Sequence, residues 1–71
     1  MANIITKLKE FRKEMKISQQ ELAQLVGVRR ETIVHLENNR YNPSLEMALK
    51  IAEIFDCHVE ALFQLNKEVE K

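Results

Sequence analysis

Apolar residues recur every three or four positions through most of the chain, which is the period of a helix with one buried face. The recurring residues are Leu8, Phe11 and Met15, then Leu22, Ala23 and Val26, then Val28, Ile33 and Leu36, then Leu45, Ala48, Leu49, Ala52 and Phe55. The pattern predicts helices over about residues 6–16, 18–25, 29–37 and 44–55. A short fifth helix is expected at 58–62.

Residues that favour helix ends separate these stretches. Ser18 followed by Glu21 forms a capping box, in which the hydroxyl accepts from the third helical N–H and the carboxylate reaches back to the cap. Gly27 is the only glycine, and a tight turn between two helices needs a residue that enters positive φ without a Cβ clash. Further candidate caps are Thr6, Ser44 and His58 before helices and Asp56 after one.

The segment from Ser18 to Arg40 has the spacing of two helices that meet at a sharp turn, as in a helix-turn-helix reader of DNA. Once its core is assigned, the third predicted helix has an outer face of Arg30, Glu31, Val34, His35 and Asn38. Arginine can donate two hydrogen bonds to guanine, glutamate can accept from the amino group of cytosine, and histidine can donate to guanine or to a phosphate. The pattern favours double-stranded DNA as the partner.

Length and charge agree with one small domain that spans residues 1–71. With 71 residues, 45% of them hydrophobic, the chain has room for a single core. The net charge is zero, but residues 1–41 hold eight basic against five acidic residues and residues 42–71 hold three against six. A basic half of this kind could bind phosphates, although a charge difference of this size between two halves of a chain also arises by chance.

Other classes of function have little support. No apolar run approaches the length of a membrane span, and no secretory apolar block follows Met1, so we expect a cytoplasmic protein without membrane association. There is no arrangement of a nucleophile with a base and no glycine-rich phosphate loop, which argues against an enzyme and a cofactor. Cys57 and His58 match no structural zinc spacing, and Cys57 is interpreted as a small core residue.

The fourth predicted helix carries a second apolar stripe of Met47, Ile51 and Ile54. A helix that is apolar on nearly all sides is buried on nearly all sides. A monomer of this size would leave the second stripe exposed to solvent. We therefore expect a twofold dimer interface within about residues 44–66, formed by Met47, Ile51, Ile54, Leu62, Phe63 and Leu65. The alternative is a more complete monomer core.

Two segments, SQQELAQLVGV and LENNRYNPSLEMALKIAEIF, resemble the Cro and phage-repressor family of XRE-type regulators. The likeness covers nearly the whole chain and is strongest to its small homodimeric repressors of the cytolysin-repressor type. It implies an all-α, five-helix, lambda-repressor-like domain with its helix-turn-helix at about 18–37, acting as a repressor and homodimer on a palindromic operator. It also supports a short antiparallel pairing of the termini, where Ile4 and Ile5 are β-branched and Phe63 and Leu65 alternate with polar residues.

The resemblance implies roles for individual residues. Residues at the start of the third helix and one turn later read bases in the family, which corresponds here to Arg30, Glu31 and His35. Glu31 has a rival role, because a carboxylate in the first turn favours the helix dipole and can pair with Arg30 or His35. The family also pairs two positions across helices that correspond to Arg12 and Glu37, and we expect a partly buried ion pair there.

Contacts to the phosphate backbone are expected around the same helix. The family counterpart of Gln19 contacts a phosphate at a helix N-terminus, and Arg29 replaces the small hydroxyl residue usual in the family. In the family, the loop after the third helix contacts the phosphate backbone of the DNA. The expected phosphate-binding residues are Gln19, Arg29, Thr32, Asn38, Asn39, Arg40 and Tyr41. For each polar loop residue, solvation and turn formation are the simpler interpretation.

A second class of function remains open at this point. The same helical fold can serve as an antitoxin-like or other protein-interaction module, and a neutral net charge would suit it. That reading leaves Arg29, Arg30 and Arg40 without a role. We expect DNA as the main partner, with room for a further protein partner that the sequence does not identify.

Overall fold

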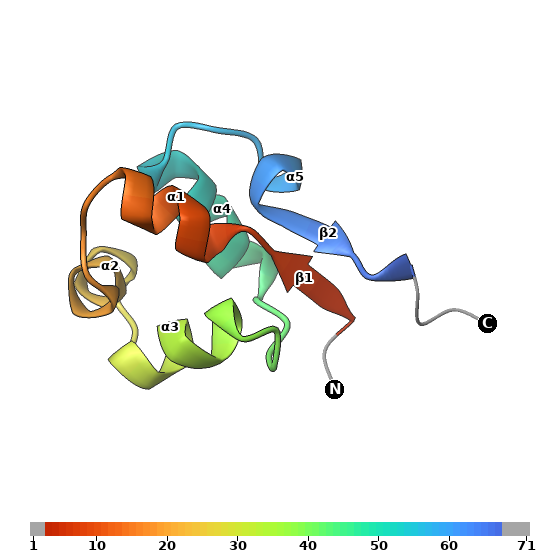
Figure 1. The fold of residues 1–71 in the computed structure, drawn as a ribbon, viewed down its shortest axis with the longest axis horizontal. Coiled ribbons are helices and arrows are strands. Elements are labelled where there is room, and N and C mark those ends of the chain that lie inside the picture. Colours follow the sequence, from red (N-terminus) through yellow and green to blue (C-terminus); the bar gives the residue numbers. More distant parts are fainter. Residues whose placement is uncertain (1–2, 68–71) are drawn as a thin grey trace.

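The computed structural model describes residues 3–67, and over this range the chain forms five short helices and two strands (Figure 1). The elements follow the order β1 (Ile4–Thr6), α1 (Leu8–Glu14), α2 (Gln19–Val26), α3 (Arg30–Glu37), α4 (Leu45–Ile54), α5 (Val59–Leu62) and β2 (Phe63–Leu65). The all-α architecture with five helices is confirmed. None of the helices in the described part of the chain is long and apolar enough to cross a bilayer.

β1 and β2, the first and last elements of the described chain, pair with each other beside α5 (Figure 1). β1 and β2 are antiparallel, with Ile4 opposite Leu65, Ile5 opposite Gln64 and Thr6 opposite Phe63. Because side chains alternate between the faces of a strand, Ile4, Thr6, Phe63 and Leu65 share one face. The predicted pairing of the termini is therefore confirmed.

Several predicted helix ends are confirmed by their hydrogen bonds. Ser18 Oγ accepts from the Glu21 N–H at 3.0 Å while the Glu21 carboxylate accepts from the Ser18 N–H at 2.7 Å, which completes the capping box. Ser44 Oγ accepts from the Met47 N–H at 3.1 Å and starts α4. Gly27 ends α2 with a φ of 88°, so the turn of the helix-turn-helix uses the one residue without a Cβ.

The ends of α1 and α5 differ in detail from the predictions. Thr6 lies in β1 and Lys7 is the N-cap of α1, but Thr6 Oγ1 still accepts from the Leu8 N–H at 3.0 Å. The Thr6 hydroxyl therefore caps the helix from one residue earlier. His58 is the N-cap of α5 as expected, yet its side chain makes no capping bond. Asp56 adopts the left-handed conformation predicted for it, with a φ of 53°.

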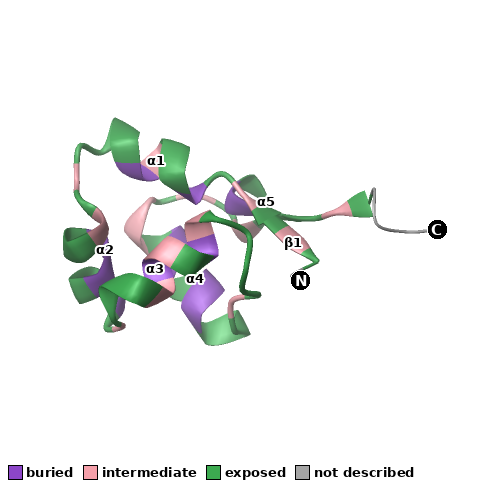
Figure 2. Cartoon of the chain, turned by 60° about the horizontal axis from the view of Figure 1, so that its bottom comes forward, coloured by how far each residue is buried: buried purple, intermediate pink, exposed green. Residues whose placement is uncertain are grey.

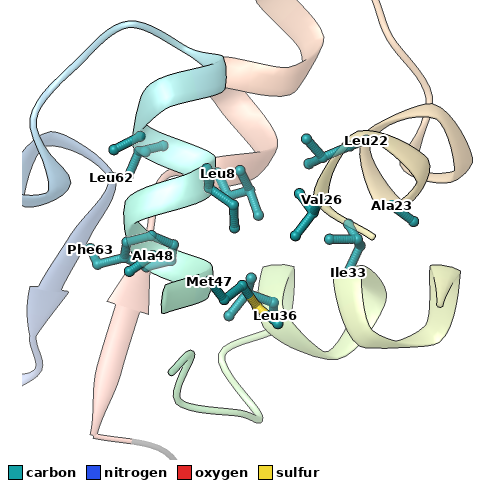
Figure 3. Close-up of a cluster of buried hydrophobic side chains, with 12 residues drawn as sticks. Leu8, Leu22, Ala23, Val26, Ile33, Leu36, Met47, Ala48, Leu62 and Phe63 are labelled. Carbon is teal, nitrogen blue, oxygen red and sulfur yellow. The ribbon is translucent and has the colours of Figure 1, made fainter. Parts of the chain in front are cut away.

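The core lies where the faces of the helices meet, and β2 closes one end of it (Figure 3). Leu8, Leu22, Ile33 and Leu36 come from α1, α2 and α3 and are buried, as the helical period predicts. Leu62 and Phe63, at the junction of α5 and β2, continue the same cluster. α2 and α3 are thus packed on the same core as the other helices.

The predicted interface on α4 is wrong for most of its residues. Met47 and Ile51 are buried in the monomer core, with Ile51 fully inaccessible, while Leu45 and Leu49 are exposed by 72% and 53%. One apolar stripe of α4 contains Leu45 and Leu49, and the other contains Met47 and Ile51. The buried Ala48 and Ala52 lie between the two stripes, so the helical period alone does not say which stripe faces inward. Leu62 and Phe63 are also core residues, Ile54 is half-buried, and Leu65 remains exposed.

Candidate nucleic-acid interface

α3 lies on the outside of the helical bundle, and Figure 2 turns its exposed surface toward the reader. Ile33 and Leu36 anchor it in the core, whereas Arg30, Glu31 and His35 are exposed. All three side chains predicted to read bases therefore share the solvent-facing surface. An arrangement of this kind leaves the polar side of a helix available to enter a major groove.

The N-terminus of α3 is uncapped by any side chain. Arg29 is the N-cap in an extended conformation, and its side chain makes no capping hydrogen bond. The exposed Arg29 thus places a cation at the end of the turn, directly before α3. Within the described residues, no ion pair joins Glu31 to Arg30 or His35, and its role as a base reader stays a prediction. Its place in the first turn still suits the helix dipole.

The predicted ion pair between Arg12 and Glu37 is present and partly buried. Arg12 Nε donates to Glu37 Oε2 at 2.7 Å and Nη2 donates to Oε1 at 3.3 Å, with 11% and 3% of the two side chains exposed. Arg12 Nη1 also donates to the carbonyl of Ile17 at 3.0 Å. The pair joins α1 to the last residue of α3, and the two opposite charges neutralise each other in a site that is largely shielded from solvent.

Gln19 belongs to the same network, which the sequence did not predict. Its Nε2 donates to Glu37 Oε1 at 3.0 Å, so the Gln19 side chain points at the end of α3. The network therefore joins the start of α2, the last turn of α1 and the end of α3. A role for Gln19 as a phosphate ligand stays a prediction that rests on its remaining amide N–H and the helix N-terminus.

Four of the predicted DNA contacts gather around one hollow beside α3. Thr32, His35, Arg40 and Tyr41 line a depression of about 440 Å³. Thr32 is half-buried in its wall, and the other three side chains are exposed. A hydroxyl, an imidazole, a guanidinium and a phenol are all hydrogen-bond donors, which matches the oxygens of a phosphate. The hollow thus brings His35 close to residues predicted to bind phosphates.

Two asparagine side chains attach the loop after α3 to β1 and to the residue before it. Asn39 Oδ1 accepts from the Thr6 N–H at 3.0 Å, and Asn42 Oδ1 accepts from the Asn3 N–H at 3.2 Å. Asn39 was predicted to bind a phosphate, but its carbonyl oxygen is turned toward the strand. Asn38 is the exposed C-cap of α3. The partners lie 33 and 39 residues apart in the sequence, so local patterns gave no signal of these bonds.

Cys57 takes no part in this surface. It is half-buried and packs against the core, and burial together with the nearby Asp56 carboxylate raises the pKa of its thiol. A raised pKa keeps the thiol protonated and less nucleophilic. In the described part of the chain, no three His, Cys, Asp or Glu side chains lie close enough together to hold a metal ion.

Five short helices, a sharp turn between α2 and α3, and an exposed α3 flanked by arginines define a helix-turn-helix DNA-binding protein. The family model described as "Helix-turn-helix" matches residues 8–62. The chain belongs to this family, in its XRE type, and is a transcriptional regulator, not an enzyme.

Known relatives and structures agree with this assignment. An uncharacterized HTH-type transcriptional regulator of Archaeoglobus fulgidus is 52% identical over 63 residues, which cover 89% of this chain and 89% of the relative. The crystal structure of the restriction-modification controller protein C.AhdI from Aeromonas hydrophila has a TM-score of 0.69 at 33% identity and covers 76% of this chain and 78% of that one. A crystal structure from Bacteroides fragilis has a TM-score of 0.77 at 26% identity, covering 86% and 98%.

Proposed function

We propose that the chain represses transcription as a homodimer that binds a palindromic operator through the major groove. The observation that carries this proposal is the exposed face of α3, where Arg30, Glu31 and His35 stand together on a helix whose opposite face is anchored in the core. One such helix reads only a few base pairs, and two copies about 34 Å apart would read both halves of a palindrome.

In this proposal the residues divide into two groups. Arg30 and Glu31 contact base edges, and His35 stands at the boundary because it also lines the hollow with Arg40 and Tyr41. Base contacts specify the sequence, and phosphate contacts fix the position of the protein on the duplex. The proposed phosphate contacts are Gln19, Arg29, Thr32, Asn38, Asn39, Arg40 and Tyr41.

We place the dimer interface on a surface formed by Leu45, Leu49 and Leu65, here named the leucine surface. These side chains are exposed by 72%, 53% and 65%. Leu45 and Leu65 line an apolar hollow of about 340 Å³ together with Val59 and Phe63. An exposed apolar patch on a small domain with a small core favours association, and a second copy that presents the same patch satisfies twofold symmetry.

Replacing Leu45 with serine tests this surface. Since Leu45 is mostly exposed in the monomer, the variant should fold normally, but we expect the dimer dissociation constant to rise about tenfold, because leucine burial in the interface is lost. Sedimentation across a range of protein concentrations measures this change. Leu25→Ser is the matched control, since Leu25 is a leucine of α2 exposed by 60% outside the surface. Equal dimerisation of Leu45→Ser and the original chain would exclude this interface.

Selection of bound sequences from random duplex DNA tests the proposed function as a whole. We expect enrichment of two inverted half-sites whose centres are about 10 base pairs apart, the spacing of one helical turn. A single unpaired half-site would contradict the dimeric mode of binding. If no motif is enriched, the operator proposal fails and a protein partner becomes the better account of the leucine surface.

A further inference from the structure

Two hydrogen bonds hold the loop after α3 against β1. The Thr6 N–H donates to Asn39 Oδ1 at 3.0 Å, and the N–H of Asn3, the residue before β1, donates to Asn42 Oδ1 at 3.2 Å. Between these two asparagines stand only Arg40 and Tyr41, both exposed and both on the wall of the hollow beside α3. β1 and the residue before it therefore hold the loop on both sides of the two loop residues that line this hollow.

The conformation of Asn39 suits this attachment. Its φ of 59° is left-handed, a region that asparagine tolerates better than most residues with a Cβ. The backbone closes α3 at the same point, because the Asn39 N–H donates to Leu36 and the Arg40 N–H donates to His35, at 3.1 and 3.0 Å. The backbone of Asn39 thus closes the end of α3, and its side chain reaches β1.

Thr6, the partner of Asn39, connects the loop to the rest of the terminal structure. Its Oγ1 donates to the carbonyl of Leu62 at 2.7 Å and accepts from the Leu8 N–H, and its backbone lies in the strand that pairs with β2. Leu65, on β2, belongs to the leucine surface. A continuous set of hydrogen bonds therefore runs from the loop beside α3 to the strand that carries this surface.

We propose that Asn39 is a positioning residue that couples operator binding to the order of the terminal sheet. The coupling rests on the proposed function, since Arg40 and Tyr41 must contact DNA for it to act. When a phosphate orders Arg40 and Tyr41, the loop stays closer to β1 and the Asn39–Thr6 bond is populated more of the time. Linkage is reciprocal, so a sheet that holds Asn39 in place also favours DNA binding.

Hydrogen exchange of the Thr6 amide tests the proposal in the full chain, with and without the selected operator. In the original protein we expect the operator to slow Thr6 exchange. In Asn39→Gly, which keeps the left-handed backbone accessible but removes the acceptor, Thr6 should exchange faster and lose its response to the operator. Operator affinity should fall roughly three- to tenfold, the loss expected of one hydrogen bond.

Two further variants separate this role from general effects. Asn38→Gly removes the neighbouring carboxamide, which is itself a proposed phosphate contact, so this variant should bind the operator more weakly. Its Thr6 exchange in the free protein, and the change at saturating operator, should remain as in the original protein. Asn39→Asp keeps an acceptor oxygen and should restore Thr6 protection even though its charge weakens DNA binding. It also provides the test if Asn39→Gly fails to fold, because loss of Thr6 protection in a folded Asn39→Asp protein would overturn the proposal.

The outcomes also distinguish this inference from the proposed function. If the original chain binds the operator and Asn39→Gly keeps both its affinity and its Thr6 response, the coupling is wrong and the proposed function stands. If the original chain binds no selected duplex, the proposed function fails and the coupling fails with it.

Discussion

Replacing Glu37 with alanine is expected to lower the free energy of unfolding by about 3–5 kcal/mol, as for other buried ion pairs that lose one partner. Glu37 accepts two hydrogen bonds from Arg12 and one from Gln19. Without it, the Arg12 guanidinium stays buried with only the Ile17 carbonyl as its partner. Chemical denaturation monitored by circular dichroism measures the loss. For a domain of this size it is a large part of the total stability.

The double variant Arg12→Met with Glu37→Leu should recover most of this loss, since apolar residues of similar volume can replace a buried pair at little cost. Glu46→Ala is the control. It breaks the exposed Glu46–Lys50 pair on α4, whose atoms are 3.5 Å apart, and should cost only about 0.3–0.5 kcal/mol. A double variant as unstable as the sum of its single changes would contradict a buried, mutually dependent pair.

Replacing Arg30 with alanine is expected to relax base preference at one position of each half-site by about 1–3 kcal/mol, the range for a bidentate arginine–guanine contact. Arg30 is exposed at the first turn of α3 and makes no ion pair within the described residues, so its guanidinium is available to a base. Selection repeated with the variant, followed by affinities for single-base substitutions of the operator, measures the change.

Arg40→Ala and Lys50→Ala are the matched controls for this prediction. Arg40 lines the hollow proposed to bind a phosphate, so its loss should weaken all duplexes alike and reduce the salt slope by about one. Lys50 lies on α4 among acidic residues, and its loss should leave binding unchanged. If Arg30→Ala instead weakened every sequence equally, Arg30 would be a phosphate contact and the assignment of base readers would be wrong.

Much of the fold could be predicted because its signals are local. The capping box at Ser18 and Glu21, the single glycine at the turn and the period of apolar residues gave the position of every helix within a few residues. The buried pair of Arg12 and Glu37 was predicted from family resemblance, since no local pattern joins residues 25 positions apart. The pairing of the termini needed the same support.

The remaining features depend on tertiary packing. On α4, Leu45 with Leu49 and Met47 with Ile51 make two equally apolar stripes, and the packing of α2 and α5 against this helix decides that the second is buried. Likewise, the polarity of Asn39 is compatible with a phosphate contact, a solvated turn or a bond to a distant strand. Only the fold brings Thr6 beside it.

The central claim is that α3 reads a specific DNA sequence as part of a dimer. The ratio of the protein's affinities for two DNA duplexes tests this claim most directly. The two duplexes are the selected palindrome and a scrambled duplex of the same composition, measured at about 150 mM salt. We predict that the palindrome binds at least about a thousandfold more tightly, the lower end for specific regulators. Equal affinity for the two duplexes, or no binding to either, would contradict the account.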